Sequence, residues 1–530
     1  MFLARLLSCI LPLAAYYVNP ILHSDYSDPD VISADGEYWM TSSSFNCVPG
    51  LQILHSTNLL DWEIVGAGLP SLSPDCDDPT ASSFNLPRHG DGVWAPSIRY
   101  FDGKFWIFWG DPDYGIFQIH ADRPDGKWSE PVPVWKGKGM IDPCPLLDDD
   151  GRVYLVHAWA GSRAGFKSVL CVSEMDRDCT HFIGEQVMVF DGNKNGNKTV
   201  EGPKFYKRNG WYYIFAPAGG VKEGWQLVLR SRNVYGPYEY RKVLHQGDTD
   251  IHGPHQGALV EDADGKGWFL HFEDRYAYGR VVHLQPLEWL DDGWCKIGVD
   301  RNGDGIGEPV ESFRAPAPYP DKPSAVKAVP ALCSATDFDG VSIPLNWQWH
   351  SNPSAGWALL NPSDGCLRLN CARQPDSWHN LWGTPNLLLE KISGEKMSLH
   401  TRLVFRPSHT GDRAGVVVMG LDYSTIEFFV EGERVKLRRI LCKDADKGTA
   451  EDISDAIDAG PACGFISADI MVTVSRGCIC EFRYRLDGKG PYKTLGLPFK
   501  AREGKWIGAK VGFFAVSFSD GNDCSYIEVY

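Results

Sequence analysis

The chain has 530 residues, too many for one ordinary hydrophobic core, so we expect two domains. Hydrophobic residues make up 43% of the sequence and charged residues 23%, a globular composition that excludes a disordered chain. The formal net charge of −16 argues against nucleic acid as a partner, because binding phosphates requires a basic surface, whereas a neutral glycan is unaffected. The 15 cysteines are an odd number with no C-x-x-C pair, and Cys478-Ile-Cys480 alone is a weak metal signal, so we interpret most of them as small buried residues.

The N-terminus resembles an export signal. Arg5 is followed by an apolar run from Leu6 to Ala15, which is shorter than the roughly 20 residues that span a bilayer. We therefore predict a signal peptide over residues 1–15 and a secreted, periplasmic or cell-surface location. The stretch Leu6-Leu7-Ser8-Cys9 also resembles a bacterial lipoprotein cleavage site, so lipidation at Cys9 is an alternative. An inert tail or a misassigned start codon is another.

An internal repeat runs through residues 16–315. Five times, an apolar stretch enters an Asp-Gly or Asn-Gly turn and is followed at once by an aromatic-rich strand, a strong hairpin signal. The turns begin at Asp35, Asp102, Asp150, Asn209 and Asp264. Their spacing leaves room for four short strands in each unit, and no sustained helical period interrupts them. Five such units in series predict a five-bladed β-propeller.

The C-terminal part of the sequence has a different rhythm. Residues 316–332 are rich in proline and lack periodicity, which predicts a linker. Alternating strand-like runs broken by glycine then return, without the repeat. They predict a β-sandwich of the concanavalin-like jelly-roll type over residues 333–530, so the fold class is all-β.

Each repeat unit opens with a distinctive residue seven to nine positions before its turn, close to a proline or glycine. These residues are Asp28, Trp94, Asp142, Glu201 and His255. In a propeller the first strand of each blade is innermost, and its leading end faces the axis. The alignment therefore predicts that these five side chains converge on one point.

Three carboxylates at one point indicate a functional site. They repel one another and lose solvation, which costs folding free energy. Glycoside cleavage uses such an arrangement, because one carboxyl group protonates the leaving oxygen while another activates water. The alternative is that each residue caps a turn or a strand end. That explanation suits any single Asp-Pro, but it is weakened by the common register of all five positions.

At these residues the chain resembles glycoside hydrolase family 43, over both domains. The segment NPILHSDYSDPDVI resembles the family's general-base segment, MIDPCPLLDDDG the segment whose Asp tunes and orients the acid, and VEGPKFYKRNGWYYIF the general-acid segment. The resemblance implies that Asp28 is the base, Asp142 the tuning residue and Glu201 the acid, in a single displacement with inversion. Asp25 is a second candidate base, although no proline follows it.

The resemblance also implies binding residues. His255, in GPHQGALV, resembles the histidine at a central metal, usually calcium, or at its water, and His252 could share this role. Trp94 is expected in the wall of the −1 sugar pocket, and Arg280 is expected to contact substrate. We thus expect one structural calcium ion and no organic cofactor.

A separate motif lies at residues 300–308, where oxygen-bearing side chains alternate with glycine as at the start of a calcium loop. A plain glycine-rich turn explains this segment equally well.

The predicted activity is removal of terminal β-xylosyl or α-L-arabinofuranosyl units from plant cell-wall hemicellulose or its oligosaccharides. Alternatives are an arabinanase or galactanase on the same propeller, or a non-catalytic sugar-binding protein, which should lack one of the three carboxylates. The segments FDGVSIPLNWQWHSNP and GDRAGVVVMGLDY resemble the C-terminal sandwich of the family's xylosidase-type members. This favours a sandwich that pushes a loop into the pocket as a lid, over one that acts as a carbohydrate-binding module.

Overall fold

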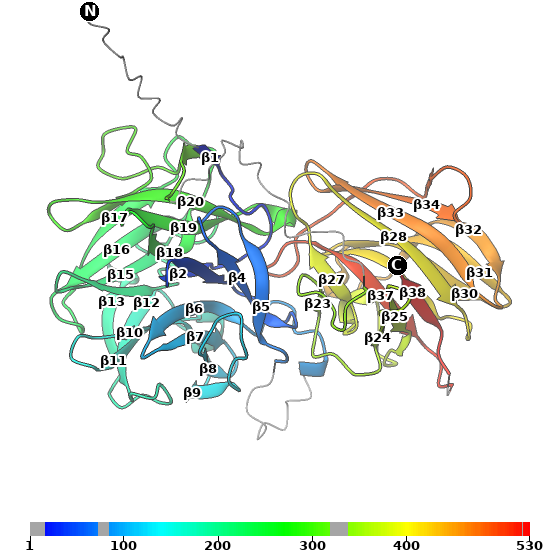
Figure 1. Cartoon of the computed structure of the whole chain (residues 1–530), viewed down its shortest axis with the longest axis horizontal. Coiled ribbons are helices and arrows are strands. Elements are labelled where there is room, and N and C mark those ends of the chain that lie inside the picture. The colour runs from blue at the N-terminus through cyan, green and yellow to red at the C-terminus, as the bar shows by residue number, and fades with distance from the viewer. Residues whose placement is uncertain (1–15, 73–83, 318–337, 522) are drawn as a thin grey trace, which may run out of the picture.

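The computed structural model describes residues 16–72, 84–317, 338–521 and 523–530, arranged as two β-rich domains side by side (Figure 1). The predicted signal peptide and lipidation site lie outside these residues, as does most of the predicted linker. Helices are confined to one short α-helix, α1 (Gly161–Ala164), and brief 3-10 turns within the described ranges. None of these helices has the length and apolar character needed to cross a bilayer.

The N-terminal domain is a five-bladed propeller, as predicted, with five four-stranded antiparallel sheets that follow the chain order. The blades are β2 (Asp30–Ala34), β3 (Glu37–Thr41), β4 (Gly50–Ser56) and β5 (Glu63–Leu69); β6 (Trp94–Phe101), β7 (Lys104–Asp111), β8 (Gly115–Ala121) and β9 (Val132–Lys136); β10 (Met140–Leu147), β11 (Val153–Trp159), β12 (Val169–Met175) and β13 (Val187–Asp191); β14 (Lys204–Arg208), β15 (Trp211–Ala218), β16 (Trp225–Ser231) and β17 (Glu239–His245); β18 (His255–Glu261), β19 (Gly267–Asp274), β20 (Arg280–Trp289) and β21 (Cys295–Ile297).

All five predicted turns join the first strand of a blade to the second. Asp35, Asp102 and Asn209 have φ values of 53°, 52° and 49°, and the glycine after each is also left-handed, as a two-residue hairpin of the Asx-Gly kind requires. In blades three and five the loop is longer, and only Gly151 and Gly265 take a positive φ. The local turn chemistry of the sequence therefore determines where each blade folds back.

The two ends of the propeller segment meet and close the ring. Strand β1 (Tyr16–Val18) pairs antiparallel with β22 (Ser312–Arg314). The Tyr17 hydroxyl donates to the Leu284 carbonyl at 2.7 Å, and Leu22 forms a β-bridge with Val282. The segment before blade one is thus held against β20 of blade five, which brings residues 25–28 next to the start of β20.

The C-terminal domain is a sandwich of two eight-stranded sheets, which confirms the second half of the fold prediction. One sheet contains β23 (Gln348–Trp349), β26 (Ala372–Arg373), β27 (Leu388–Lys391), β29 (Arg413–Met419), β30 (Tyr423–Glu431), β31 (Arg434–Cys442), β32 (Asp452–Pro461) and β37 (Lys510–Ser517). The other contains β24 (Ala358–Asn361), β25 (Cys366–Asn370), β28 (Met397–Arg406), β33 (Ile466–Ser475), β34 (Ile479–Leu486), β35 (Lys493–Thr494), β36 (Phe499–Lys500) and β38 (Tyr526–Val529).

The hydrophobic core is continuous between the two domains. One cluster of buried side chains runs from blades one and two into the sandwich and includes Trp39, Trp109, Trp349 and Phe513. Across the junction, Val48 and Trp349 exchange two backbone hydrogen bonds of 3.0 and 2.6 Å.

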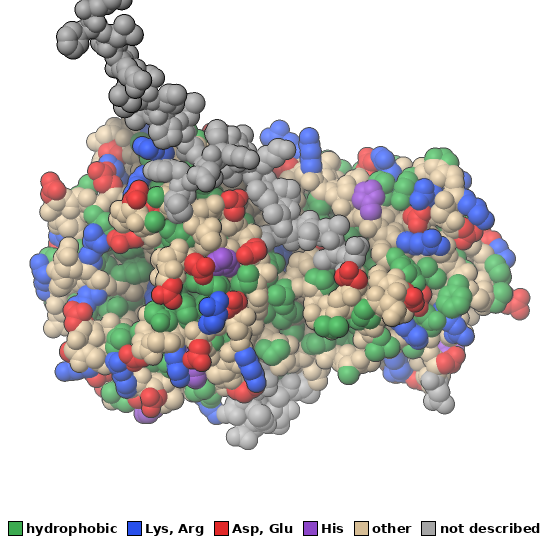
Figure 2. Space-filling model, in the orientation of Figure 1, with side chains coloured by type: hydrophobic (Ala, Val, Ile, Leu, Met, Phe, Trp, Pro, Cys, Tyr) green, Lys and Arg blue, Asp and Glu red, His purple; other side chains and the backbone are tan. Residues whose placement is uncertain are grey.

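Ten of the twelve described cysteines are buried and unpaired, in line with their interpretation as small apolar residues. Acidic and basic side chains are interspersed over both domains on the face shown in Figure 2.

Candidate active site

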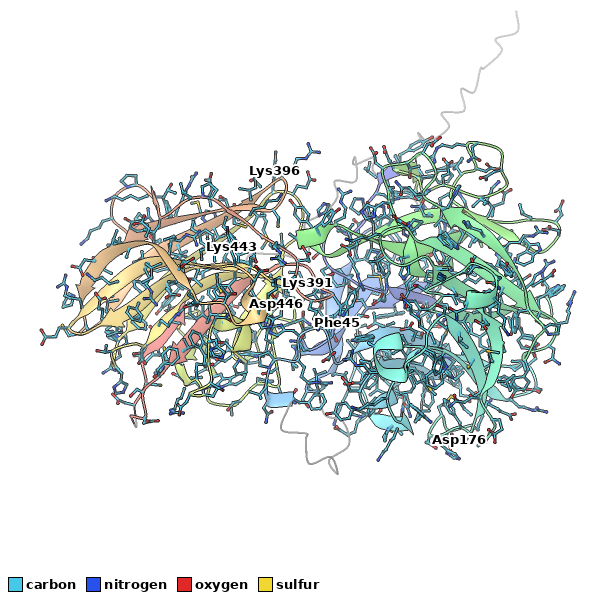
Figure 3. All side chains as sticks on the ribbon, turned by 180° about the vertical axis from the view of Figure 1, so that it is seen from behind. Phe45, Asp176, Lys391, Lys396, Lys443 and Asp446 are labelled. Atoms are coloured by element: carbon cyan, nitrogen blue, oxygen red, sulfur yellow. The ribbon has the colours of Figure 1, made fainter. Side chains whose placement is uncertain are left out.

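A cavity of about 630 Å³ collects the side chains that the sequence singled out. Its lining includes all six predicted site residues, namely Asp28, Trp94, Asp142, Glu201, His255 and Arg280. The first strands β18, β2, β6, β10 and β14 contact one another in that order, so their leading ends surround the propeller axis. Phe45, which also lines the cavity, lies where the propeller meets the sandwich (Figure 3). The predicted convergence of five blades on one site is therefore present in the structure.

A backbone irregularity directs these side chains into the cavity. At the leading end of each first strand one residue has a positive φ, and three of these strands also show a register shift there. These residues are Asp28 (54°), Ala95 (36°), Asp142 (56°), Gly202 (57°) and Gln256 (34°). Bulges bend a strand and re-aim its side chains, and strained conformations of this kind cluster at functional sites.

The bulges correct one detail of the sequence alignment. Asp28 and Asp142 occupy the left-handed position itself, whereas Trp94, Glu201 and His255 each lie one residue before it. The alignment had treated all five residues as equivalent. The error arose because the offsets were counted to turns of different loop length, so that the true register could not be read from the sequence.

The two oxygens of Asp28 have different surroundings. Oδ2 accepts a hydrogen bond of 2.6 Å from the Ser43 hydroxyl, whose oxygen in turn accepts one of 2.7 Å from the Ala95 amide. Oδ1 lies 3.5 Å from a guanidinium nitrogen of Arg280. One oxygen is thus fixed by the protein while the other faces the cavity beside a cation. This arrangement suits a carboxylate that accepts a proton from water.

Asp142 and Glu201 are coupled through the backbone. Asp142 is 5% exposed, and its Oδ2 accepts a 2.7 Å hydrogen bond from the amide of Gly202, the residue after Glu201. The Glu201 side chain remains 28% exposed, and its Oε1 lies 3.3 Å from Nε2 of His255. Burial, followed by the negative charges of Glu201 and Asp28, raises the pKa of Asp142 well above its usual range. Asp142 therefore positions the acid segment and adds a titratable group beside it.

His255 is almost fully buried, and its Nδ1 has no hydrogen-bond partner among the described residues. The described ranges nevertheless contain no group of three or more His, Cys, Asp and Glu side chains arranged around a metal position. The side chains beside His255 therefore do not form a calcium cage, and an ion there would depend on water for most of its ligands. His252 does not line the cavity, and its Nε2 lies 3.5 Å from Glu273 instead.

The segment 300–308 is organised mainly by its own backbone. Both oxygens of Asp300 accept amide hydrogen bonds, from Gly303 and Gly305, and Asp304 accepts one from Ile306. The buried Glu308 is paired with Arg301. This is the pattern of a glycine-rich turn, and a calcium ion in it stays an untested prediction.

Comparison with known proteins identifies the chain. Residues 17–295 match the family model for glycosyl hydrolases family 43, and residues 335–526 match the model for the β-xylosidase C-terminal concanavalin A-like domain. The chain belongs to glycosyl hydrolase family 43.

Individual relatives agree with this assignment. A putative β-xylosidase of Xylanibacter ruminicola is 34% identical over 94% of this chain and 85% of the relative. A non-reducing-end α-L-arabinofuranosidase of Bacteroides ovatus is 27% identical over 80% of this chain and 78% of the relative. The crystal structure of the family 43 protein BlXynB from Bacillus licheniformis matches with a TM-score of 0.78 and 25% identity, covering 97% and 98% of the two chains. The prediction of a glycosidase of this family is confirmed.

In this family 43 chain, Asp25 is placed differently from the alternative base that the sequence suggested. It does not line the cavity, and both of its oxygens accept backbone hydrogen bonds, from Arg280 at 2.9 Å and from Gly508 at 3.0 Å. Its carboxylate therefore has no free face toward a substrate. The geometry favours Asp28 over Asp25 as the base of the family 43 site.

The sandwich of the family 43 chain contributes one residue to the cavity. Trp506 lines it, and its ring centre lies 5.7 Å from the Arg280 guanidinium carbon. The sequence led us to expect a loop from this domain but did not identify Trp506, because no repeat or motif distinguishes it from the other tryptophans. Ser43 was missed for the same reason. It is one of three consecutive serines, and only the fold brings it to Asp28.

Proposed function

We propose that the protein is an inverting, exo-acting glycosidase that removes terminal β-xylosyl or α-L-arabinofuranosyl units from hemicellulose oligosaccharides. Its membership of glycosyl hydrolase family 43 and the names of its relatives support this substrate class. The observation that carries the proposal is one cavity holding three carboxylates from three different blades, with Arg280 beside one of them. Both sugars present similar oxygens in space, so one cavity can accept either.

The roles follow from the surroundings of each group. Glu201 is the most exposed of the three carboxyl groups and protonates the glycosidic oxygen as the bond breaks. Asp28, anchored by Ser43, removes a proton from the attacking water through Oδ1. Arg280 lies next to that oxygen and is placed to hold sugar hydroxyls. Trp94 donates from Nε1 to the Gly90 carbonyl at 2.9 Å, which fixes its indole as a flat wall of the sugar pocket.

Two further elements belong to the proposal. A calcium ion held largely by water beside His255 would have a structural or electrostatic role, because a single histidine is not a zinc-type ligand set. The apolar N-terminal segment supports export of the chain, with lipidation at Cys9 as the alternative route to the cell surface.

The test is a substrate screen with identification of the product. The purified protein would be incubated with nitrophenyl β-xyloside, α-L-arabinofuranoside and β-galactoside, and with xylobiose. Proton NMR would record the anomer that forms first. We expect release of xylose or arabinose with inverted configuration, since inverting carboxylate pairs leave room for a water molecule between base and sugar. A first product with retained configuration would contradict the mechanism, and preferred cleavage of the galactoside would contradict the substrate class.

A further inference from the structure

The buried carboxylate of Asp25 joins two cavity-lining segments from different domains. Oδ1 accepts the amide of Arg280 at the start of β20, and Oδ2 accepts the amide of Gly508 in the sandwich. Asp25 is 6% exposed. A Cβ atom at Gly279 would lie 2.4 Å from its Oδ1, and one at Gly508 would lie 2.7 Å from the Gly279 amide nitrogen. The two backbones thus approach each other around this carboxylate as closely as only glycine permits.

The loop that ends at Gly508 carries Trp506 in an unusual conformation. Trp506 has a φ of 66°, a value that is strained for a bulky side chain. A strained residue persists only where its surroundings over-determine it. The Gly504 amide closes the turn by donating to the Ile507 carbonyl at 2.8 Å, and the Gly508 amide is held by Asp25. Asp25 therefore helps to hold this loop against the propeller, together with the Ala277 carbonyl, which accepts the Ala509 amide at 2.8 Å.

The indole of Trp506 packs where it affects the cavity. A Cβ atom at Gly90 would lie 2.8 Å from Cδ1 of Trp506, so the ring lies directly on that glycine. The carbonyl of the same Gly90 accepts the hydrogen bond from Trp94. The guanidinium carbon of Arg280 lies 5.7 Å from the centre of the Trp506 ring. Trp94, Trp506 and Arg280 therefore form one continuous wall that depends on the seating of the loop.

We propose that Asp25 is a positioning residue that seats Trp506 against Gly90 and Arg280 and so completes the substrate-binding wall. This inference rests on the proposed glycosidase function of the cavity. Because the wall contacts substrate in the ground state and in the transition state alike, its loss should raise KM more than it lowers kcat. A general base in the same position would behave in the opposite way.

The test is a double-mutant cycle with Asp25→Asn and Trp506→Ala. The introduced asparagine can keep one of the two bonds through its amide oxygen, but its NH2 group would oppose the other backbone amide. We expect Asp25→Asn to raise KM for xylobiose about tenfold, which corresponds to about 1.4 kcal/mol, with kcat within about threefold. In the Trp506→Ala background the same change should add less than about twofold.

The matched control is Asp262→Asn. Asp262 is also buried in blade five and also accepts backbone amides, from Asp264 and Lys266, but it does not line the cavity or contact the sandwich loop. We expect its kinetic constants to stay at parental values even if its stability falls. A purely structural effect of removing a buried carboxylate would appear in both variants.

A second readout does not depend on catalysis. Hydrogen exchange of the peptide covering residues 501–509, measured by mass spectrometry, should be faster in Asp25→Asn than in the parent and unchanged in Asp262→Asn. Unchanged exchange of this peptide in Asp25→Asn would overturn the inference. The inference would also be overturned if Asp25→Asn raised KM as much in the Trp506→Ala background as in the parent. A large fall in kcat without a change in KM would overturn it as well. If the parent cleaves no glycoside, the proposed function fails, while the exchange experiment still decides the role of Asp25.

Discussion

Asp28 and Asp30 lie two residues apart in the chain, and both are buried, yet their surroundings differ in charge. Asp30 is fully buried; its Oδ2 accepts hydrogen bonds of 2.7 Å from the Arg99 guanidinium and the Ile98 amide, and Nζ of Lys204 lies 3.8 Å away. Within the described ranges Asp28 has a single cation, Arg280, at 3.5 Å. Asp30 is therefore surrounded by two cations. Asp28 has one cation, in a cavity that also holds the carboxyl groups of Asp142 and Glu201.

Burial disfavours the charged form of a side chain in both surroundings, but the neighbouring charges oppose it at Arg99 and reinforce it at Asp142. At Arg99 burial disfavours the charged guanidinium, but Asp30, Cys144 and Tyr206 together outweigh burial and raise the pKa of Arg99. At Asp142 burial and the charge of Glu201 act in the same direction, and the pKa of the carboxyl group rises. In this comparison, the carboxylate with two cations is packed inside the propeller, whereas the carboxylates that share one cation line the cavity.

Asp30→Asn is the substitution expected to have the largest effect on the stability difference between the two sites. Removing this charge leaves Arg99 and Lys204 buried without their carboxylate, and breaking a buried ion pair costs about 3–5 kcal/mol. We expect a large fall in the unfolding temperature, measured by calorimetry or fluorescence. Asp28→Asn is the matched control, because it makes the same change two residues away and should alter the unfolding temperature little. Equal destabilisation by both changes would contradict the distinction.

A smaller effect, of opposite sign, is expected for Asp142→Asn. The folded-state pKa of Asp142 lies above its usual value, so this carboxyl group contributes stability below the usual pKa and loses it as the pH rises through the folded pKa. An asparagine side chain can still accept the Gly202 hydrogen bond but never ionises. At neutral pH the variant should therefore unfold at a higher temperature than the parent, and the difference should shrink toward pH 3. A variant that is less stable than the parent at pH 7 would contradict this account.

Features that depend on local chemistry could be predicted from the sequence. The five Asx-Gly turns identify the hairpins, and their repetition identifies the propeller, because the glycine of each turn takes the positive φ that folds the chain back. Counting back from the turns located the cavity residues, including Asp28 and Glu201. The register of the first strands was predicted with an error of one residue in three blades, because the turns differ in loop length.

Features that depend on long-range contacts could not be predicted. Ser43 reaches Asp28 only because β3 folds back on β2, and Trp506 reaches the cavity only because two domains pack together. Asp25 shows this most clearly, because its partner Gly508 is 483 residues away in the chain. From the sequence it resembled a second base. In the structure its carboxylate accepts hydrogen bonds from the backbone amides of Arg280 and Gly508.

The central claim is that Glu201 supplies the proton and Asp28 activates the water, and a leaving-group comparison tests it most directly. Nitrophenolate departs without protonation, whereas a sugar alkoxide needs a proton. We predict that Glu201→Gln loses about 10²–10⁴-fold in kcat/KM on xylobiose but far less on nitrophenyl xyloside. Asp28→Asn should be severely impaired on both substrates. Equal loss on both substrates for Glu201→Gln, together with leaving-group dependence for Asp28→Asn, would reverse the two roles and contradict the account.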